Sequence, residues 1–270
     1  MKLYYGLMAL GLALYSCSSS DDDGGGYYEP PIKLDLPAEG ESRVTSIKHS
    51  GSVPASYDWD LTYNATHLTS AKGNLVAGED NAYSSTLSYT SKGVNIANSN
   101  NMNMAVTLNN DGNIVELTVN KDVYSFEYNV NGYLTEWSKT THDANFADEA
   151  SKAWATLTYE AGNLARIEYV WNNNDPIVLT FTPSNYVNEN GLLPAALSRY
   201  LGCFGFEHLY YAGMLGRPTA HLVGKVAIDG LDDDDYTIEY GYSFAGNNTT
   251  LCTFNSKDGA TVASVNYYYK

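Results

Sequence analysis

The sequence predicts an all-β fold, a long antiparallel meander curled into a barrel-like or half-open barrel sheet with one short helical insert. Three observations lead to this prediction. Tyrosine is unusually abundant, with 24 residues against 7 phenylalanines, and aromatic residues suit a pleated, half-buried surface. Apolar and polar residues alternate in successive segments, as in strands with one buried face. A unit of strand, polar turn and strand recurs along the chain.

Residues 1–16 are predicted to be a lipoprotein signal peptide. Lys2 supplies a positive start, and the apolar run from Leu7 to Tyr15 has the length of a secretory signal core but is too short for a permanent membrane helix. Leu14-Tyr15-Ser16-Cys17 resembles a bacterial lipobox, in which the cysteine is acylated and becomes the new N-terminus. We therefore predict lipid attachment, palmitate included, at Cys17. The alternative is a cysteine that lies beside an apolar run by chance.

Residues 17–37 are predicted to be a flexible acidic and glycine-rich spacer, because its serines, aspartates and glycines cannot bury apolar surface. The cluster Asp21 to Asp23 resembles the export tag of surface lipoproteins in the Bacteroidetes. Several acyl chains on one residue give a stable anchor. We therefore expect a lipid-anchored outer-membrane protein displayed at the cell surface, whose contact with the membrane is the lipid on Cys17. A periplasm-facing lipoprotein is the alternative.

Residues 38–270 are predicted to form a single β-barrel-like domain, because no Pro/Gly/Ser-rich linker interrupts them. The chain carries 15 basic and 31 acidic residues, a formal net charge of −16. Binding to phosphates needs clustered lysine and arginine, so nucleic acid is not an expected partner. Cys203 and Cys252 could pair as a disulfide or remain buried thiols, and the sequence leaves both alternatives open.

Five segments repeat the hairpin unit. Turns at Asp111-Gly112, Asn131-Gly132 and Gly162-Asn163 carry residues that accept a positive φ, which is a strong local hairpin signal. Such units bury their apolar faces only when they pair edge to edge into a larger sheet. The segments are Tyr57 to Ala71, Ser85 to Ala97, Met104 to Val119, Tyr124 to Trp137 and Ala155 to Trp171.

The alternation predicts the buried face of three strands in particular, with polar or charged residues on the opposite face. The predicted buried residues are Tyr57, Trp59, Leu61, Tyr63, Tyr124, Phe126, Tyr128, Val130, Ile238, Tyr240, Tyr242 and Phe244. A transmembrane barrel with these faces turned to lipid is an alternative, but the chain ends in Lys270 rather than in the terminal aromatic residue usual for such barrels.

The alternation stops between Asn188 and Val226, and an insert over about residues 191–215 is predicted to be helical. Glu207 to Leu215 indicates a short apolar helix. An apolar insert in a sheet protein most simply plugs the open end of the curved sheet, and a ligand pocket walled by the insert is the alternative. An earlier helix is indicated by apolar residues at helical spacing, namely Leu192, Leu193, Ala196, Leu197, Tyr200 and Leu201.

The same region carries a family resemblance. HLYYAGMLGRPTAHLVGKV (His208 to Val226), the preceding GLLPAALSRYLG and strand repeats of the form Y-x-x-x-G-x-L are similar to a family of Bacteroidetes lipoproteins, a domain of unknown function with a porin-like fold. The similarity extends over roughly Arg43 to Lys270 and is sharpest from Leu209 to Arg217. It implies a curved antiparallel sheet that resembles a barrel, and it implies no known catalytic residues.

The sequence indicates no catalytic residue, cofactor or metal site. The histidines are scattered without zinc-motif spacing, and no nucleophile elbow is present. Asp229 and Asp232 to Asp235 could offer oxygen ligands to Ca²⁺, but without the spacing of a calcium loop they are more simply a solvated turn. Adjacent residues on a helix point to different faces, so His208 beside Glu207 is interpreted as a packing residue.

These features together predict a non-catalytic envelope or surface lipoprotein that binds a glycan or a partner protein. Trp137, Trp154 and Trp171 would favour glycan binding if two of them stood exposed and coplanar on one surface. A hydrolase with carboxylates at the open end of the sheet is one alternative, and it needs convergent buried titratable groups. A structural component of a surface assembly is the other, and it needs a broad apolar patch.

Overall fold

The computed structural model describes residues 43–51, 56–75, 82–90, 93–99, 103–142, 149–230, 236–255 and 261–270. The signal peptide and spacer expected before residue 38, with Cys17, lie outside the described residues. Sixteen strands form one antiparallel sheet. The strands are β1 (Val44–Gly51), β2 (Tyr57–Tyr63), β3 (Leu68–Leu75), β4 (Tyr83–Thr90), β5 (Gly93–Asn98), β6 (Met104–Leu108), β7 (Ile114–Val119), β8 (Asp122–Tyr128), β9 (Leu134–His142), β10 (Glu149–Glu160), β11 (Asn163–Trp171), β12 (Ile177–Val187), β13 (His221–Asp229), β14 (Tyr236–Ala245), β15 (Asn248–Asn255) and β16 (Thr261–Tyr269).

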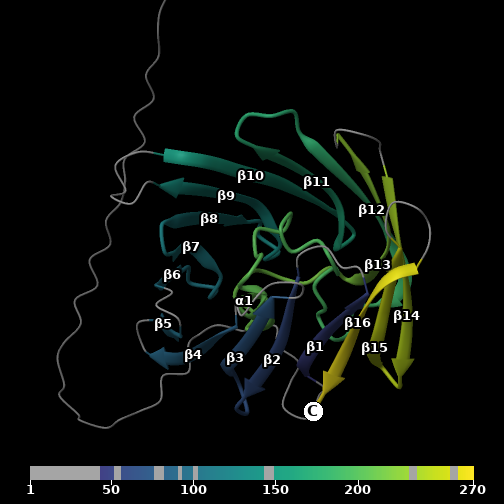
Figure 1. Ribbon diagram of the computed structural model, residues 1–270, viewed down its shortest axis with the longest axis horizontal. Helices are drawn as coiled ribbons and strands as arrows, with labels where there is room; N and C mark the ends of the chain where they lie inside the picture. The colour runs from purple at the N-terminus through teal and green to yellow at the C-terminus, as the bar shows by residue number, and fades with distance from the viewer. Residues whose placement is uncertain are drawn as a thin grey trace, which may run out of the picture.

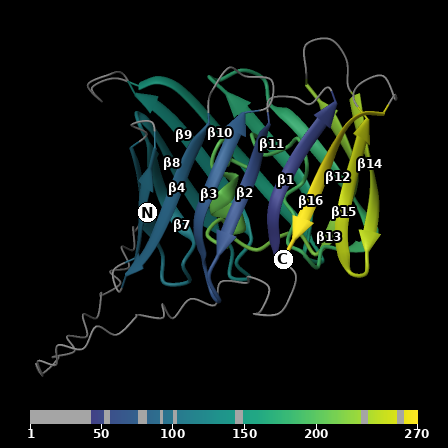
Figure 2. The same ribbon diagram turned by 60° about the horizontal axis from the view of Figure 1, so that its bottom comes forward.

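The first strand of the chain pairs with the last within this sheet. β1 is antiparallel to β16, with Ile47 opposite Tyr267. The remaining strands pair with their sequence neighbours, except that β5 and β6 end the strand order on either side of a seam and lie beside each other without ladder pairing. Figure 1 looks into the resulting ring, and Figure 2 shows its wall from the side. The predicted meander is confirmed as a nearly closed barrel with one seam.

The barrel wall is apolar inside and polar outside. Leu61 and Phe126 are buried toward the interior, whereas their neighbours Asp60 and Glu127 are exposed. A lipid-embedded barrel has the reverse arrangement, with an apolar outer band and a polar lumen. The wall therefore has the character of a water-facing barrel around an apolar core.

Two of the predicted buried residues are exposed instead. Val130 has a relative exposure of 102% because it lies in the turn after β8 and not in the strand. Phe244 is 37% exposed and follows a register shift between Ser243 and Phe244 near the end of β14. In both cases the strict alternation stops before the last apolar residue of the predicted series, because a turn or bulge changes the side-chain direction.

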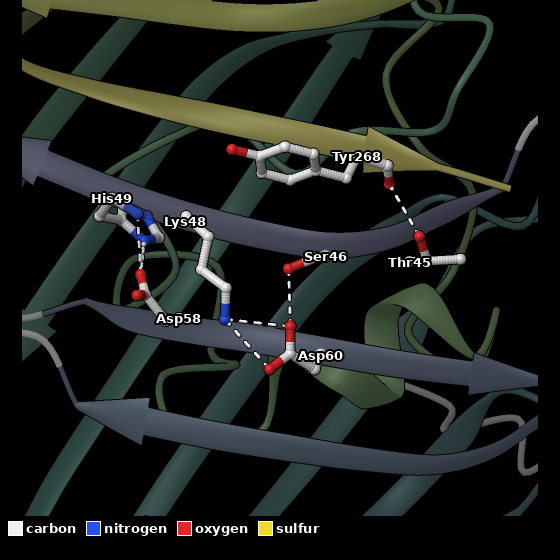
Figure 3. A network of polar contacts seen from close by, with 7 residues as sticks. All are labelled: Thr45, Ser46, Lys48, His49, Asp58, Asp60 and Tyr268. Atoms are coloured by element: carbon white, nitrogen blue, oxygen red, sulfur yellow. Dashed lines mark hydrogen bonds and ion pairs between the residues drawn. The ribbon is translucent and has the colours of Figure 1, made fainter.

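Polar side chains on the outer face extend the short ladder between β1 and β2 (Figure 3). The register between these strands covers two residue pairs. Beyond it, the backbone N–H of His49 donates to Asp58 Oδ1 at 2.8 Å. Ser46 Oγ and Lys48 Nζ donate to the Asp60 carboxylate at 2.6 and 3.1 Å. Side chains thus reinforce the Ser46–Asp60 pair of the ladder and connect the two strands beyond it at Asp58.

The segment between β12 and β13, residues 188–220, fills the interior of the barrel, and we call it the plug. Leu197, Leu209 and Met214 of the plug are buried in the same hydrophobic core as the inner faces of the strands. Figures 1 and 2 show its helix α1 inside the ring of strands. The expectation that the insert plugs the curved sheet is confirmed.

The predicted helix at the start of the insert is wrong, and the second is shorter than predicted. The helical part of the plug is α1 (Glu207–Tyr211), of five residues, and residues 191–202 form turns and irregular backbone. Gly191, Ala196 and Gly202 have φ values of 61°, 63° and 69°, which a right-handed helix does not allow. Pro194 also lacks the backbone N–H that a helix uses. No helix among the described residues has the length and apolar character to cross a bilayer.

Aromatic side chains of the wall hydrogen-bond to the backbone of the plug. Trp137 Nε1 donates to the carbonyl of Tyr200 at 2.9 Å, and the Tyr240 hydroxyl donates to the carbonyl of Ala195 at 3.0 Å. A backbone carbonyl removed from water needs such a donor, since leaving it unpaired costs about 1–3 kcal/mol. An aromatic side chain with an N–H or O–H group can therefore bury its ring in the core and donate a hydrogen bond to a plug carbonyl.

The two remaining cysteines are free thiols. Cys203 lies in the plug and Cys252 on β15, and both are buried. Burial raises the pKa of both thiols, that of Cys252 to about 12. Of the two alternatives left open by the sequence, the structure has the buried thiols.

Tyr240→Phe is expected to lower the free energy of unfolding by about 1–3 kcal/mol, because it keeps the ring and removes the donor to Ala195 inside the barrel. Urea unfolding followed by circular dichroism measures the change. Tyr268→Phe is the matched control, since this ring is exposed on the outer face, and it should change stability by less than about 0.5 kcal/mol. Equal effects of the two substitutions would contradict the role of the wall-to-plug bond.

Candidate functional site

A cavity of about 440 Å³ opens at one end of the barrel. The chain enters β1 at this end, the turns β6–β7 and β8–β9 lie there, and both ends of the plug contribute to it. Its described lining includes two arginines, four tyrosines, five asparagines and one aspartate. Sites for small molecules usually measure ~300–1,000 Å³, so this cavity has the size of a ligand site.

Two turns of the same construction form one side of the cavity. Asn109 begins the β6–β7 turn and Asn129 begins the β8–β9 turn. In each, the asparagine Oδ1 accepts hydrogen bonds from the backbone N–H groups two and four residues later, at 3.0 or 3.1 Å. Gly112 and Gly132 both have a φ of 81°, which glycine adopts without strain. The asparagine-to-glycine spacing thus gives the same rigid turn twice.

Arg43 contributes to the cavity from the start of β1. Its guanidinium lies 5.6 Å from the centroid of the Tyr63 ring. Its Nη1 donates to the carbonyl of Asn64 at 3.2 Å. The contact with the ring face and the hydrogen bond together fix the direction of this side chain.

Arg217 contributes from the plug, on the other side of the seam in strand order. Its guanidinium lies 5.9 Å from the centroid of the Tyr133 ring, and its Nη1 donates to the carbonyl of Asn131 at 3.4 Å. Its backbone N–H donates to the carbonyl of Gly132 at 2.9 Å. The β8–β9 turn therefore holds both the backbone and the side chain of Arg217.

The plug approaches this turn closely at Gly216. A Cβ at this position would lie 2.9 Å from the carbonyl oxygen of Gly132, and φ is +80°. A larger residue would have to separate the plug from the turn, and it would move the neighbouring Arg217. The absence of a side chain at residue 216 is thus part of how the cavity is built.

Tyrosines form the inner wall of the cavity. The Tyr128 hydroxyl donates to the carbonyl of Ile114 at 2.8 Å, and the Tyr63 hydroxyl donates to the carbonyl of Tyr211 at 3.4 Å. Burial raises the pKa of both hydroxyls, which keeps them protonated. Both side chains are consequently fixed, and they present aromatic surface to the cavity.

The lining suits binding of a polar ligand better than acid–base chemistry. Asp111 is the single carboxylate among the described residues that line the cavity. Glycoside hydrolysis usually needs two carboxyl groups across the scissile bond. The hydrolase alternative therefore finds no support in this cavity.

The three tryptophans proposed as a sugar platform do not share one surface. Trp137 is buried beneath the plug. Trp154 and Trp171 are 36% and 39% exposed. Because Trp154 is opposite Val170 while Trp171 is opposite the inward-facing Ala153, their side chains leave opposite faces of the sheet. The condition set for a coplanar platform is not met.

Among the described residues, no group of His, Cys, Asp or Glu is arranged to hold a metal ion. The ring of His49 contacts the Asp58 carboxylate and that of His221 contacts the Asn163 side chain, so the two histidines lie in different parts of the wall. Asp229 is exposed at the end of β13, and Asp232 to Asp235 lie outside the described residues.

Glu207 and His208 of α1 are both buried, with relative exposures of 5% and 0%. Burial raises the pKa of the Glu207 carboxyl from 4.5 to about 7, although it accepts a hydrogen bond from the Gly205 N–H at 3.1 Å. Burial lowers the pKa of His208 from 6.5 to about 3. The His208 ring packs against Trp59, with centroids 4.8 Å apart. His208 is the packing residue that the sequence indicated.

The model of the family described as a domain of unknown function (DUF4595) with porin-like fold matches residues 43–253. The chain belongs to this family. The match confirms the resemblance seen in the sequence, and it includes both cavity arginines.

Two crystal structures are similar to this DUF4595 protein. A porin-like protein from Bacteroides uniformis ATCC 8492 has a TM-score of 0.65 at 18% identity and covers 84% of this chain and 98% of its own. A porin-like protein from Bacteroides vulgatus ATCC 8482 has a TM-score of 0.56 at 12% identity and covers 85% and 99%. No curated protein matches the chain. At such identities the similarity concerns the fold alone.

Sequence reasoning missed that Arg43 and Arg217 line one cavity in this DUF4595 protein. Arg217 ends the Leu209 to Arg217 motif, and Arg43 lies at the start of the family match. The signal that could have drawn attention to them is charge, because acidic residues outnumber basic ones by 31 to 15. Their common cavity depends on pairing across the barrel, which no local pattern reveals.

The two buried groups of α1 predict opposite dependences of stability on pH. Because the pKa of the Glu207 carboxyl is raised in the folded state, this group contributes stability that is fully present below pH 4.5. That contribution is lost as the pH rises to about 7. Because the pKa of His208 is lowered in the folded state, this group contributes stability that is fully present above pH 6.5. That contribution is lost as the pH falls to about 3. Between pH 4.5 and 6.5 the two effects oppose each other.

Urea unfolding of the wild type, Glu207→Gln and His208→Gln between pH 3 and 8 tests this. The stability advantage of the wild type over Glu207→Gln should shrink as the pH rises from 4.5 to 7, by at most about 1.4 kcal/mol per pH unit. Its advantage over His208→Gln should shrink as the pH falls from 6.5 to 3. If the free energy of unfolding changed with pH in the same way for all three proteins, neither group would have a different pKa in the folded and the unfolded state.

Proposed function

We propose that this DUF4595 protein is a lipid-anchored lipoprotein of the outer membrane that binds a glycan, without catalysis, in the cavity at one end of its barrel. The observation that supports the ligand class is the lining, which combines tyrosine rings with asparagine amides and arginines. Sugars offer apolar ring faces together with many hydroxyl groups, and a site with aromatic walls and a few placed polar groups complements both.

The tether predicted to carry the lipid would enter the domain at the end of the barrel where the cavity opens. Arg43 lines the cavity and leads into β1, and the backbone N–H of Lys270 donates to its carbonyl at 3.2 Å. A tether from Cys17 would therefore join the barrel beside the cavity. Residues 18–42 reach roughly 80–90 Å when fully extended. That reach would let the cavity stand clear of the membrane to which the lipid is attached.

A partner protein is the second candidate, supported by one small cluster of exposed apolar residues. The rings of Tyr186 and Phe244 are 4.7 Å apart, and both are exposed together with Val187. The other large exposed apolar side chains of the described residues lie on other strands or turns, namely Val130, Trp154, Trp171 and Tyr268. A surface assembly would need a broader patch, so the cavity is the better-supported site.

Asn131→Trp should abolish or strongly weaken glycan binding, because residue 131 is exposed in the β8–β9 turn and lines the cavity. A glycan array identifies a ligand for the full chain in detergent, and titration calorimetry with that ligand should show a loss of about tenfold or more. Asn110→Trp, in the matching turn but not among the lining residues, is the control and should bind as the wild type does. If Asn131→Trp bound the glycan as tightly as Asn110→Trp does, the glycan would not bind in this cavity.

Lipid attachment is expected on the sulfur of Cys17, with residues 1–16 removed. Mass spectrometry of the protein purified from the membranes of its own host should find the acylated cysteine at the N-terminus. Cys17→Ser should prevent both acylation and membrane retention. Protease treatment of intact cells then separates surface display from a periplasm-facing position. A bare Cys17 thiol in membrane-purified protein would contradict the anchor.

A further inference from the structure

The wall of the barrel has two open strand edges, and both lie at the seam (Figure 1). Among the described strands, each one except β5 and β6 pairs with a neighbour on both sides. β5 pairs with β4 and β6 pairs with β7, and no ladder joins β5 to β6. The backbone groups of these two strands that face the seam can therefore pair with another strand.

The sequence of these edges does not discourage further pairing. Natural edge strands usually carry charged residues, prolines or bulges. The described residues of β5 and β6 include neither a charged residue nor a proline. The ladder of β6 shifts register between Thr107 and Leu108, whereas that of β5 is regular over its whole length. The edge of β5 is thus the better docking edge for a strand.

Apolar side chains beside the seam are incompletely covered. Val94 and Ile96 of β5 and Val106 of β6 pack against the core but are only partly buried. Their neighbours one strand further from the seam, Leu87 of β4 and Leu117 of β7, are 3% and 0% exposed. A strand that filled the seam with apolar residues on its inner face would remove this surface from water.

The chain before β1 carries a segment with the pattern that the seam needs. Ile32-Lys33-Leu34-Asp35-Leu36 alternates apolar and charged residues, as a strand with one buried face does. Prolines precede and follow it at residues 30, 31 and 37, and a proline ends strand pairing because it has no N–H to donate. Its five residues match the length of β6. The segment itself lies outside the part of the chain that the structure describes.

The connection to β1 limits where this segment can reach. Arg43 leads into β1 at the end of the barrel where the cavity opens. The extended chain between Leu36 and Arg43 spans roughly 23–25 Å. β2, β3 and β4 separate β1 from β5, so a strand added to β5 lies about 24 Å from β1 along the wall. The curvature of the wall shortens the direct path, so the segment can reach the seam.

The connection also sets the direction of the segment. β5 runs in the same direction as β1, because successive strands between them are antiparallel. β5 therefore begins at the cavity end. A segment that leaves the seam at this end to join Arg43 runs the opposite way, so it meets the edge of β5 as an antiparallel strand. This is the orientation of every other pair in the sheet.

We propose that residues 32–36 of this DUF4595 protein add to the edge of β5 as an antiparallel strand and fill the seam of the barrel. Ile32, Leu34 and Leu36 would face the core, and Lys33 and Asp35 would face the solvent. No ladder has to be broken to admit the strand, because none joins β5 to β6. The free tether would then be residues 18–31, with an extended reach of roughly 45–50 Å.

Disulfide trapping in the full chain with Cys17→Ser tests this proposal. Asp35→Cys is combined with Asn95→Cys or with Ala97→Cys, which are exposed positions of β5, because residues opposite each other on one face come within disulfide distance. One of the two pairs should form an intramolecular disulfide about tenfold or more faster than Asp35→Cys with Thr180→Cys. Thr180 is the matched control, since it is exposed on β12, across the barrel from β5 (Figure 1).

Amide hydrogen exchange of β5 is the second measurement. Leu34→Asp would turn a carboxylate toward the core, so the amides of β5 should exchange about tenfold or more faster than in the wild type. Lys33→Ser is the control, because it changes the solvent-facing side of the segment, and its β5 amides should exchange as in the wild type. Circular dichroism checks that the barrel is folded in each variant.

Two results would overturn the proposal. They are trapping on β5 that is no faster than trapping at Thr180, and β5 exchange that Leu34→Asp leaves unchanged. Disulfides that form only between two molecules would assign the strand to a second copy of the chain and likewise reject the inference. Because Cys203 and Cys252 are buried, the introduced pair supplies the reactive thiols in every trapping variant.

Discussion

The structure depends on filling the inside of a wide barrel whose inner wall is apolar. Barrels of eight strands are just filled by their own side chains, whereas sixteen strands enclose a space that water occupies in porins. Here the inner faces carry residues such as Leu61, Phe126 and Ile167, which gain free energy only when water is excluded. A polypeptide segment must therefore fill the space, and the plug does so.

Filling a barrel with irregular chain creates a second requirement, because the plug brings its own backbone polar groups into the core. The wall meets this requirement with Trp137 and Tyr240, which donate to plug carbonyls. Tyr128 and Tyr242 similarly donate to carbonyls of the wall, at 2.8 and 2.7 Å. Tyrosine can supply both buried area and a donor, which phenylalanine cannot. These three tyrosines therefore do in the barrel what phenylalanine could not.

The plug also creates the site. It enters and leaves the barrel at the same end, and where it meets two short, rigid turns a cavity remains. One arginine comes from the plug and the other from the start of β1. Their positions follow from two constraints that act at a distance, the pairing of β1 with β16 and the seating of Gly216 on the β8–β9 turn. The binding proposed for this DUF4595 protein therefore depends on the same interactions that complete the fold.

The sequence by itself determined the strands, their buried faces and the hairpin turns, because these follow from period-two alternation and from residues such as Gly132 that accept a positive φ. It also carried the lipidation signal at Cys17, which remains a prediction. Only the tertiary structure decided that residues 191–202 are not helical, since wall donors and positive-φ residues compete there with local hydrogen bonding. It alone brought Arg43 and Arg217 to one cavity, because strand pairing and plug packing join residues that are far apart in the chain.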